Sequence, residues 1–186
     1  MSALHSGAIA LLLIGAGGCG SSTEAESDSP RIVSGVPDPC ELLPPDVWES
    51  IVDASVAESS VGDTKENVVR ASCFYRYEDG GIGRLTIEDA AAWERRREEE
   101  RKDFEDRGVL LPDDQPVSGL GDEAILDVRH NELNVRSGDF VMRADHGRPV
   151  ASGAEALSPA EKEDSRDLQR EIIGVALNRL EQSAPG

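Results

Sequence analysis

The chain has 186 residues, a length typical of one domain with short terminal segments. It carries 37 Asp and Glu against 19 Lys and Arg, and the resulting net charge of −18 repels phosphate backbones and excludes nucleic-acid binding. Apolar residues make up 38% and charged residues 30%, so the composition allows a hydrophobic core and excludes a wholly disordered acidic chain.

An apolar run near the N-terminus predicts export. Residues 8–16 (AIALLLIGA) are too few to span a membrane, which takes roughly 20 apolar residues, and they fit a secretory signal over residues 1–18. The following Gly17-Gly18-Cys19 resembles the bacterial lipobox, whose cysteine is acylated. We expect Cys19 to be lipidated, which would anchor the chain in the cell membrane, facing the extracytoplasmic side. Residues 19–36 would be a flexible polar tether; the alternative is an ordinary cleaved signal with an incidental cysteine.

The two remaining cysteines, Cys40 and Cys73, form an even pair in what would be an oxidising compartment. We expect a disulfide, which would stabilise the fold by about 3–4 kcal/mol in the chain-entropy model. The alternatives are a metal pair, a redox dithiol and a catalytic thiol. No CxxC is present, no histidine lies at zinc spacing, and both His130 and His146 are distant in sequence.

The first half of the domain mixes one helix with strands. Residues 46–52 (DVWESIV) have helical spacing, residues 54–58 are a candidate short strand, and residues 62–67 form a polar loop. Residues 71–77 (ASCFYRY) have the aromatic enrichment of a strand and place Cys73, Tyr75 and Tyr77 on one face. The turn signal at residues 79–81 joins this strand to residues 83–88 (GRLTIE), which predicts a β-hairpin.

A charged helix follows at residues 90–106. Trp93 and Phe104, eleven residues apart, lie on one face of this helix as aromatic anchors. Arg96 and Glu100 have the i, i+4 spacing of an ion pair within the helix. Residues 108–117 are predicted to be a loop.

A strand meander and a helix complete the chain. The meander is predicted at residues 125–129, 133–136 and 140–144, with a loop over residues 146–156. Ser158, Pro159 and Glu161 form the N-terminal signature of a capping box, and the helix that follows carries an apolar stripe that ends at Leu180. Residues 183–186 are predicted to be a disordered tail.

These elements predict an α+β fold. Strands and helices segregate instead of alternating singly, which favours an antiparallel sheet of about five to six strands with helices packed on one face. The sheet and its helices form a single domain over residues 37–182.

No catalytic motif was found: the sequence contains no GxSxG, HExxH, P-loop or GxGxxG pattern. Gly119-x-Gly121 lacks the rest of a phosphate cradle and is interpreted as a turn that leads into a strand. The acidic pairs at residues 113–114 and 122–123 leave calcium as an alternative, although no EF-hand spacing exists. His146 is interpreted as a polar loop residue. We therefore predict no enzyme activity, no metal and no cofactor.

The order of these motifs resembles a family of actinobacterial lipoproteins, the domain of unknown function 3558 family. The resemblance rests on Cys19 with its tether, Asp38-Pro39-Cys40, Cys73 on an aromatic strand, residues 119–124 (GLGDEA) and residues 135–139 (VRSGD). It implies an envelope-anchored, disulfide-bonded α+β domain and brings no catalytic residues.

The sequence is compatible with three functions. The first is a non-enzymatic binding or interaction module whose acidity suits a cationic or protein partner in the envelope. The second is a carrier or sensor for a small amphipathic ligand held in a cavity of roughly 300 Å³ or more. The third is an enzyme of unrecognised type.

Overall fold

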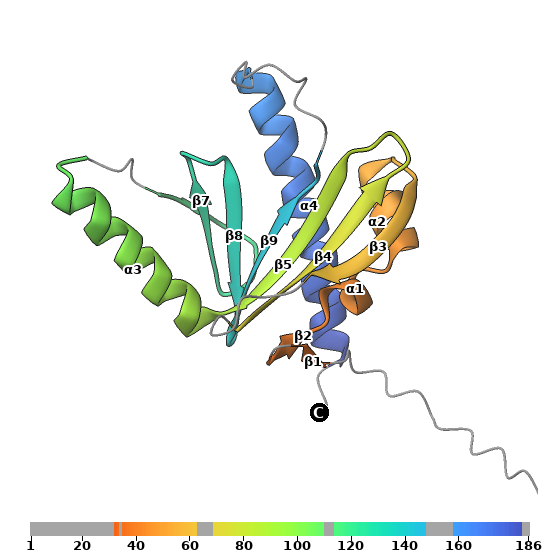
Figure 1. Ribbon diagram of the computed structural model, residues 1–186, viewed down its shortest axis with the longest axis horizontal. Helices are drawn as coiled ribbons and strands as arrows, with labels where there is room; N and C mark the ends of the chain where they lie inside the picture. The colour runs from red at the N-terminus through yellow and green to blue at the C-terminus, as the bar shows by residue number, and fades with distance from the viewer. Residues whose placement is uncertain (1–31, 34, 63–68, 110–113, 148–157, 184–186) are drawn as a thin grey trace, which may run out of the picture.

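A computed structural model describes residues 32–33, 35–62, 69–109, 114–147 and 158–183 (Figure 1). Within these residues the chain forms nine strands and four helices. The elements are β1 (Ile32–Val33), β2 (Val36–Pro37), α1 (Pro39–Leu42), α2 (Pro45–Val52), β3 (Val56–Gly62), β4 (Arg70–Tyr77), β5 (Ile82–Asp89), α3 (Ala90–Asp106), β6 (Gln115–Val117), β7 (Glu123–Asp127), β8 (Glu132–Ser137), β9 (Phe140–Asp145) and α4 (Pro159–Ser183).

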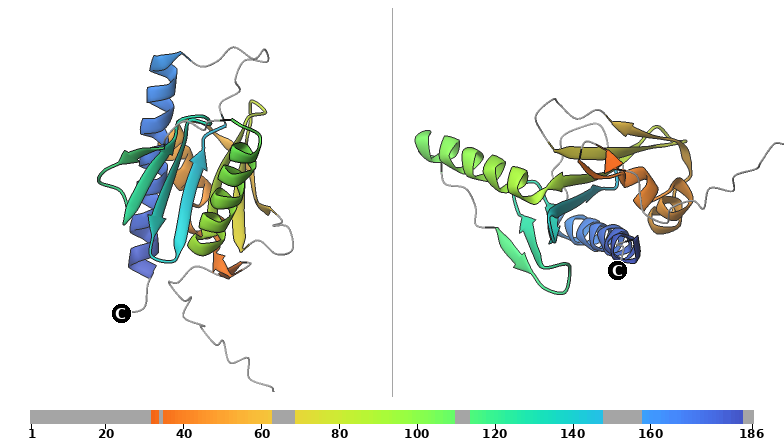
Figure 2. Two further views of the ribbon diagram at one scale, coloured as in Figure 1. Left: turned by 90° about the vertical axis from the view of Figure 1, so that its left-hand side faces the viewer. Right: turned by 90° about the horizontal axis from the view of Figure 1, so that it is seen from below.

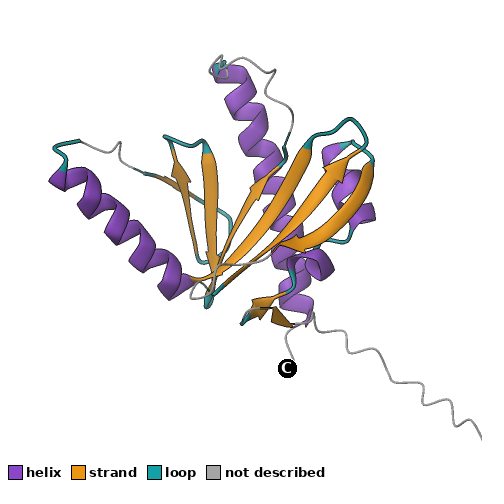
Figure 3. Ribbon diagram, in the orientation of Figure 1, coloured by secondary structure: helices purple, strands orange, loops and turns teal. Residues whose placement is uncertain are grey.

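The strands β3 to β9 form one antiparallel sheet in the order β3-β4-β5-β9-β8-β7-β6 (Figure 3). The predicted α+β class is therefore confirmed, with seven strands in the main sheet in place of five to six. The additional strand is β6, which lies in the segment predicted to be a loop. It is three residues long and contains Pro116, so it has no alternating pattern that a sequence could reveal.

Helices cover both faces of the sheet, which corrects the expectation that they share one face. The helices α1, α2 and α4 pack on the first face, and α3 lies on the second, as Figure 2 shows. The second face has its own small apolar cluster, in which Ala90 and Trp93 of α3 pack with Val141 and the partly buried Ile125. Since α3 connects β5 in the middle of the sheet to β6 at its edge, the helix passes over the β9-β8-β7 half of this face.

The main core lies between the first face and α1, α2 and α4. Its centre is a stacked pair, Trp48 on Tyr75, with ring centroids 4.0 Å apart and planes inclined by 8°. The predicted face of Cys73, Tyr75 and Tyr77 is buried here. Gly83 is required for this packing, because a Cβ at that position would lie 2.5 Å from the Trp48 ring.

Both ends of the domain differ from the predicted bounds. The strands β1 and β2 form a small hairpin that begins inside the predicted tether and ends at Pro37, the first residue of the predicted domain, and Val36 is fully buried. Gly35 at φ 84° turns the chain between these two strands. At the other end α4 continues to Ser183, one residue into the predicted tail. Cys19 and residues 19–31 lie outside the described residues.

Local hydrogen bonds explain where elements begin and end. The capping box is confirmed, because the Ser158 N–H donates to Glu161 and the Glu161 N–H donates to the Ser158 hydroxyl. The strand β7 ends at Asp127, two residues before the predicted end. Asp127 Oδ1 accepts hydrogen bonds from the N–H groups of Arg129 and His130, which folds the chain into a turn.

Candidate functional site

The second face of the sheet carries the charged side chains of the strands. Register places five arginines there, one or two from each of β4, β5, β8 and β9: Arg70, Arg76, Arg84, Arg136 and Arg143. This is every arginine in the described strands. The same face carries carboxylates of β3, β5, β7, β8 and β9, so it gathers charged side chains of both signs.

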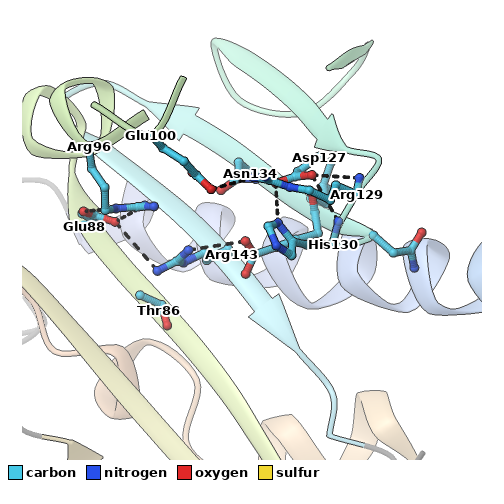
Figure 4. A network of polar contacts seen from close by, with 12 residues as sticks. Thr86, Glu88, Arg96, Glu100, Asp127, Arg129, His130, Asn134 and Arg143 are labelled. Atoms are coloured by element: carbon cyan, nitrogen blue, oxygen red, sulfur yellow. Dashed lines mark hydrogen bonds and ion pairs between the residues drawn. The ribbon is translucent and has the colours of Figure 1, made fainter. Parts of the chain in front are cut away.

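Under α3, charged side chains of the strands and of the helix form a buried network, which is drawn in Figure 4. Glu88 of β5 has a side chain that is only 2% exposed, and it accepts two hydrogen bonds from Arg96 of α3, at 2.9 and 3.3 Å. Arg143 of β9 lies 3.9 Å from the same Glu88 carboxylate and 3.3 Å from the Glu132 carboxylate. The network joins α3 to three strands.

Arg143 is the most enclosed cation of this network, with a side chain that is 15% exposed. Burial lowers its pKa, which the carboxylates of Glu132 and Glu88 partly offset. An arginine nevertheless stays protonated in a protein. Its Nε is buried and has no hydrogen-bond partner among the described residues.

A second set of contacts holds the outer end of α3. Arg129, in the turn after β7, donates to Glu100 at 2.7 Å and lies over the Phe104 ring, 4.9 Å from its centroid. The predicted pair of Arg96 with Glu100 is not formed, because each of these residues binds another element. Trp93 is buried against the sheet and Phe104 lies under Arg129, so both act as anchors.

Asp127 and His130 are in hydrogen-bond contact beside this site, with His130 Nδ1 2.7 Å from Asp127 Oδ2. Partial burial raises the pKa of Asp127, but the hydrogen bonds from His130 and from the backbone outweigh burial and hold it below its usual range. The Asp127 carboxylate is thus engaged by its own turn.

The contacts of this network hold α3 in position on the sheet. The Glu88, Glu132, Glu100 and Asp127 carboxylates each face an arginine or a histidine. In the described part of the chain, no three His, Cys, Asp or Glu side chains gather into a group that could hold a metal ion. The network fixes α3 to the sheet and provides no free nucleophile.

The other half of the second face, over β3, β4 and β5, has a different arrangement of charged side chains. The side chains of Arg70 and Arg84 are half-buried and form no hydrogen bond or ion pair within the described residues, although the register places Arg70 opposite Glu88 and Arg84 opposite Asp145. Next to them Phe74, Arg76 and Ile82, with Glu58 and Ser60 of β3, line a shallow hollow of about 170 Å³. We call this half, defined by Ser60, Arg70, Phe74, Arg76, Ile82 and Arg84, the arginine surface.

The structure joins the two predicted cysteines. Cys40 and Cys73 form a disulfide with an S–S distance of 2.05 Å, which links α1 to β4. It lies on the first face, in the core, and not on the arginine surface. The disulfide is therefore a structural element.

The other candidate residues occupy turns. His146 Nε2 lies 3.0 Å from the Ser165 hydroxyl of α4, and the His146 carbonyl accepts from Tyr77. Asp122 accepts a hydrogen bond from the Gly138 N–H, and Asp114 pairs with Arg97. Asp113 lies outside the described residues. Gly121 has φ 54° and leads into β7, which confirms the interpretation of this glycine pair as a turn.

Glu88 and Arg143 were not among the residues predicted from the sequence. A pattern that indicates a charged sheet face is present in the sequence, because charged residues occupy alternate positions of strands whose other positions are apolar. Three such strands placed side by side make a charged face. The missing information was the β5–β9 pairing, which brings Glu88 and Arg143 onto neighbouring strands from positions 55 residues apart.

Comparison with known proteins found no matching family model, no matching curated protein and no matching solved structure. The resemblance to the lipoprotein family therefore stays a prediction. Among the described residues, no helix is long and apolar enough to cross a membrane.

Proposed function

We propose that this protein is a lipid-anchored lipoprotein on the extracytoplasmic side of the cell membrane, and that its domain is a non-enzymatic module that binds a partner protein. The observation that carries the binding role is the arginine surface. It offers two arginines, Arg70 and Arg84, whose side chains have no ion-pair partner among the described residues, together with exposed apolar atoms and a hollow. Such features suit recognition of another molecule.

The anchoring part of the proposal rests on the sequence. An apolar run followed by Cys19 and a polar segment is the arrangement of a lipidated N-terminus, and two acyl chains would give stable membrane attachment where one gives only marginal binding. The Cys40–Cys73 disulfide suits an oxidising compartment. The resemblance to the domain of unknown function 3558 family belongs to this same proposal.

A protein partner is favoured over a small amphipathic ligand. The hollow on the arginine surface holds about 170 Å³, and pockets for small molecules hold roughly 300 Å³ or more. The core between the first face and its helices is filled by fully buried side chains, Trp48, Tyr75 and Met142 among them. If the natively purified chain retained the additional mass of a bound ligand, this result would instead favour the function of a small-ligand carrier.

Anchoring is tested by replacing the acylated residue. We expect Cys19→Ser to move the protein from the membrane fraction to the soluble fraction and to abolish its labelling by a palmitate analogue. The matched control is Ser21→Ala, which keeps the cysteine and should stay in the membrane fraction. A Cys19→Ser protein that still sediments with membranes would contradict the anchor.

The binding role is tested by crosslinking on intact cells. A photoreactive residue replaces either Ile82, which is 45% exposed on the arginine surface, or the exposed Glu171 of α4. We expect a discrete protein adduct from position 82 and none from position 171. Equal labelling at both positions, or none at position 82, would contradict the assignment.

A further inference from the structure

The two edges of the main sheet are differently protected. At one edge β6 is three residues long and has Pro116 at its centre, a residue that cannot donate a backbone hydrogen bond to an added strand. At the other edge β3 is seven residues long (VAESSVG), contains no proline and carries one charged side chain, Glu58. Long, unprotected edge strands are the places where another chain adds to a sheet.

The register identifies which backbone groups of β3 face outward. The Tyr77 N–H donates to Gly81 and its carbonyl accepts from Gly80, so the backbone groups of Tyr77 point toward the β5 side. Because backbone direction alternates along a strand, Phe74 and Ser72 point toward β3, where they pair with Ser60 and Gly62.

The N–H and C=O groups of Ser59 and Val61 therefore point away from the sheet. No other element of the described chain pairs with β3 on that side.

Arg76 of β4 brings the arginine surface next to this edge, and Arg84 lies one strand further in, on β5. Arg84 and Arg70 have no ion-pair partner in the described residues, and Arg76 pairs with Glu58 at 3.8 Å with both side chains more than half exposed. An exposed pair of this kind is weak and is readily exchanged for another carboxylate. The local charge thus favours an acidic partner, although the chain as a whole has a net charge of −18 and repels one.

Phe74 extends the surface to the edge strand. A Cβ at Gly62 would lie 2.1 Å from the Phe74 ring, so the ring lies over the backbone of β3. With Ile82 and Ser60 it lines the hollow, which provides an apolar position between charged ones. A strand that alternates acidic and apolar residues matches such a surface.

We propose that the outer edge of β3 and the arginine surface together bind an extended acidic segment of a partner protein by antiparallel strand addition. This inference rests on the proposed binding role and names its partner chemistry. Backbone hydrogen bonds to Ser59 and Val61 would supply affinity. The carboxylates of the added strand would lie toward Arg76, which is on the strand next to β3, and repulsion from the remaining surface would prevent binding elsewhere.

The test uses the full chain and three synthetic heptapeptides, in which valine alternates with glutamate, glutamine or lysine. We expect the glutamate peptide to bind at least tenfold more tightly than the glutamine peptide by fluorescence anisotropy, and the lysine peptide not to bind at the arginine surface. Binding of the glutamate peptide should weaken with added salt. Equal affinities for the three peptides, or no binding of the glutamate peptide at millimolar concentration, would overturn the proposal.

Variants separate the two parts of the surface. Arg76→Gln should weaken glutamate-peptide binding by up to about fivefold, the upper end for an exposed ion pair, while Arg76→Lys should retain most of it. Val61→Pro removes an outward N–H and should abolish binding, while Val61→Thr keeps the N–H and should not. Each variant is first shown to melt cooperatively near the unmodified protein.

Amide hydrogen exchange gives the structural readout. With the glutamate peptide bound, the amides of Ser59 and Val61 should slow, whereas those of Ser60 and Gly62, already paired with β4, should change little. Arginine-dependent binding without this protection would overturn strand addition. Sedimentation that shows a dimer lost in Val61→Pro would assign the β3 edge to a second copy of this chain. Neither outcome affects the anchoring or crosslinking tests, so the proposed function can survive the failure of this inference.

Discussion

Two tyrosines of β4 use their hydroxyl groups in different ways. Tyr75 donates to the Leu43 carbonyl at 2.6 Å, and burial raises its pKa. Tyr77 donates to the His146 carbonyl at 2.7 Å and accepts from Trp48 Nε1 at 2.9 Å. The Tyr77 hydroxyl thus joins α2, β4 and the loop after β9.

We expect Tyr77→Phe to lower the free energy of unfolding by about 1–3 kcal/mol, because it leaves the buried Trp48 N–H without its acceptor. Urea unfolding measures the change. Ser50→Ala, which removes an exposed hydroxyl bonded within α2, is the control and should stay within about 0.5 kcal/mol. A Tyr77→Phe protein as stable as this control would show that the bridge does not contribute.

Asp127 makes stability depend on pH. Its pKa is lower in the folded protein than in the unfolded chain, so its charged form stabilises the fold above the unfolded value of 3.8, and this contribution is lost as the pH falls through the folded value. We expect Asp127→Asn to be less stable than the unmodified protein near neutral pH and equally stable at the most acidic pH at which both fold. Asp167→Asn, on the exposed side of α4, should show no such convergence. A difference that persists unchanged into acid would contradict this assignment.

At the scale of elements, α3 depends on charge for its position. Only Ala90 and Trp93 of this helix are buried, and the rest of the helix is held by ion pairs such as Arg96 with Glu88 and Arg129 with Glu100. The helix therefore crosses half of the sheet. It packs on the sheet through apolar contacts at its first turn and through ion pairs further along.

Glu88→Gln is expected to destabilise the protein by about 2–4 kcal/mol, because it leaves the enclosed Arg143 and the half-exposed Arg96 without their shared carboxylate. Hydrogen exchange should show that the amides of α3 open more readily while those of β4 change little. Glu94→Gln removes an exposed pair with Arg136 and should cost less than about 1 kcal/mol. Equal effects of the two variants would refute a special role for Glu88.

Most elements of the fold could be predicted from the sequence, because their signals are local. Ser158 and Glu161 define the start of α4, and the alternation of Leu85 and Ile87 identifies the buried face of β5. The strand β6, the position of α3 on the second face and the Glu88–Arg143 pairing could not be predicted, because each depends on the order of strands in the sheet. Cross-sheet order is set by tertiary packing and leaves no periodic trace in one chain.

At the scale of the whole molecule, the disulfide joins the N-terminal helices to the sheet. Cys40 in α1 and Cys73 in β4 are 33 residues apart in sequence. The double variant Cys40→Ser/Cys73→Ser should lose about 3–4 kcal/mol of stability. The unmodified protein unfolded with a thiol reductant should match the double variant, and Cys19→Ser should match the unmodified protein. A double variant of unchanged stability would refute the structural role of this bond.

The pairing of β5 with β9 also bears on how the chain folds. The β3–β4, β4–β5, β6–β7, β7–β8 and β8–β9 ladders are local hairpins. The β5–β9 ladder instead joins residues that are at least 51 positions apart in sequence, the separation of Asp89 from Phe140. Contacts of long sequence separation form slowly, because the loop must be closed before they are gained. A chain that emerges N-terminus first therefore completes its first hairpins and exposes the inner edge of β5 until β9 arrives. We expect this interval to be the stage at which the nascent protein is most prone to aggregate and depends most on chaperones.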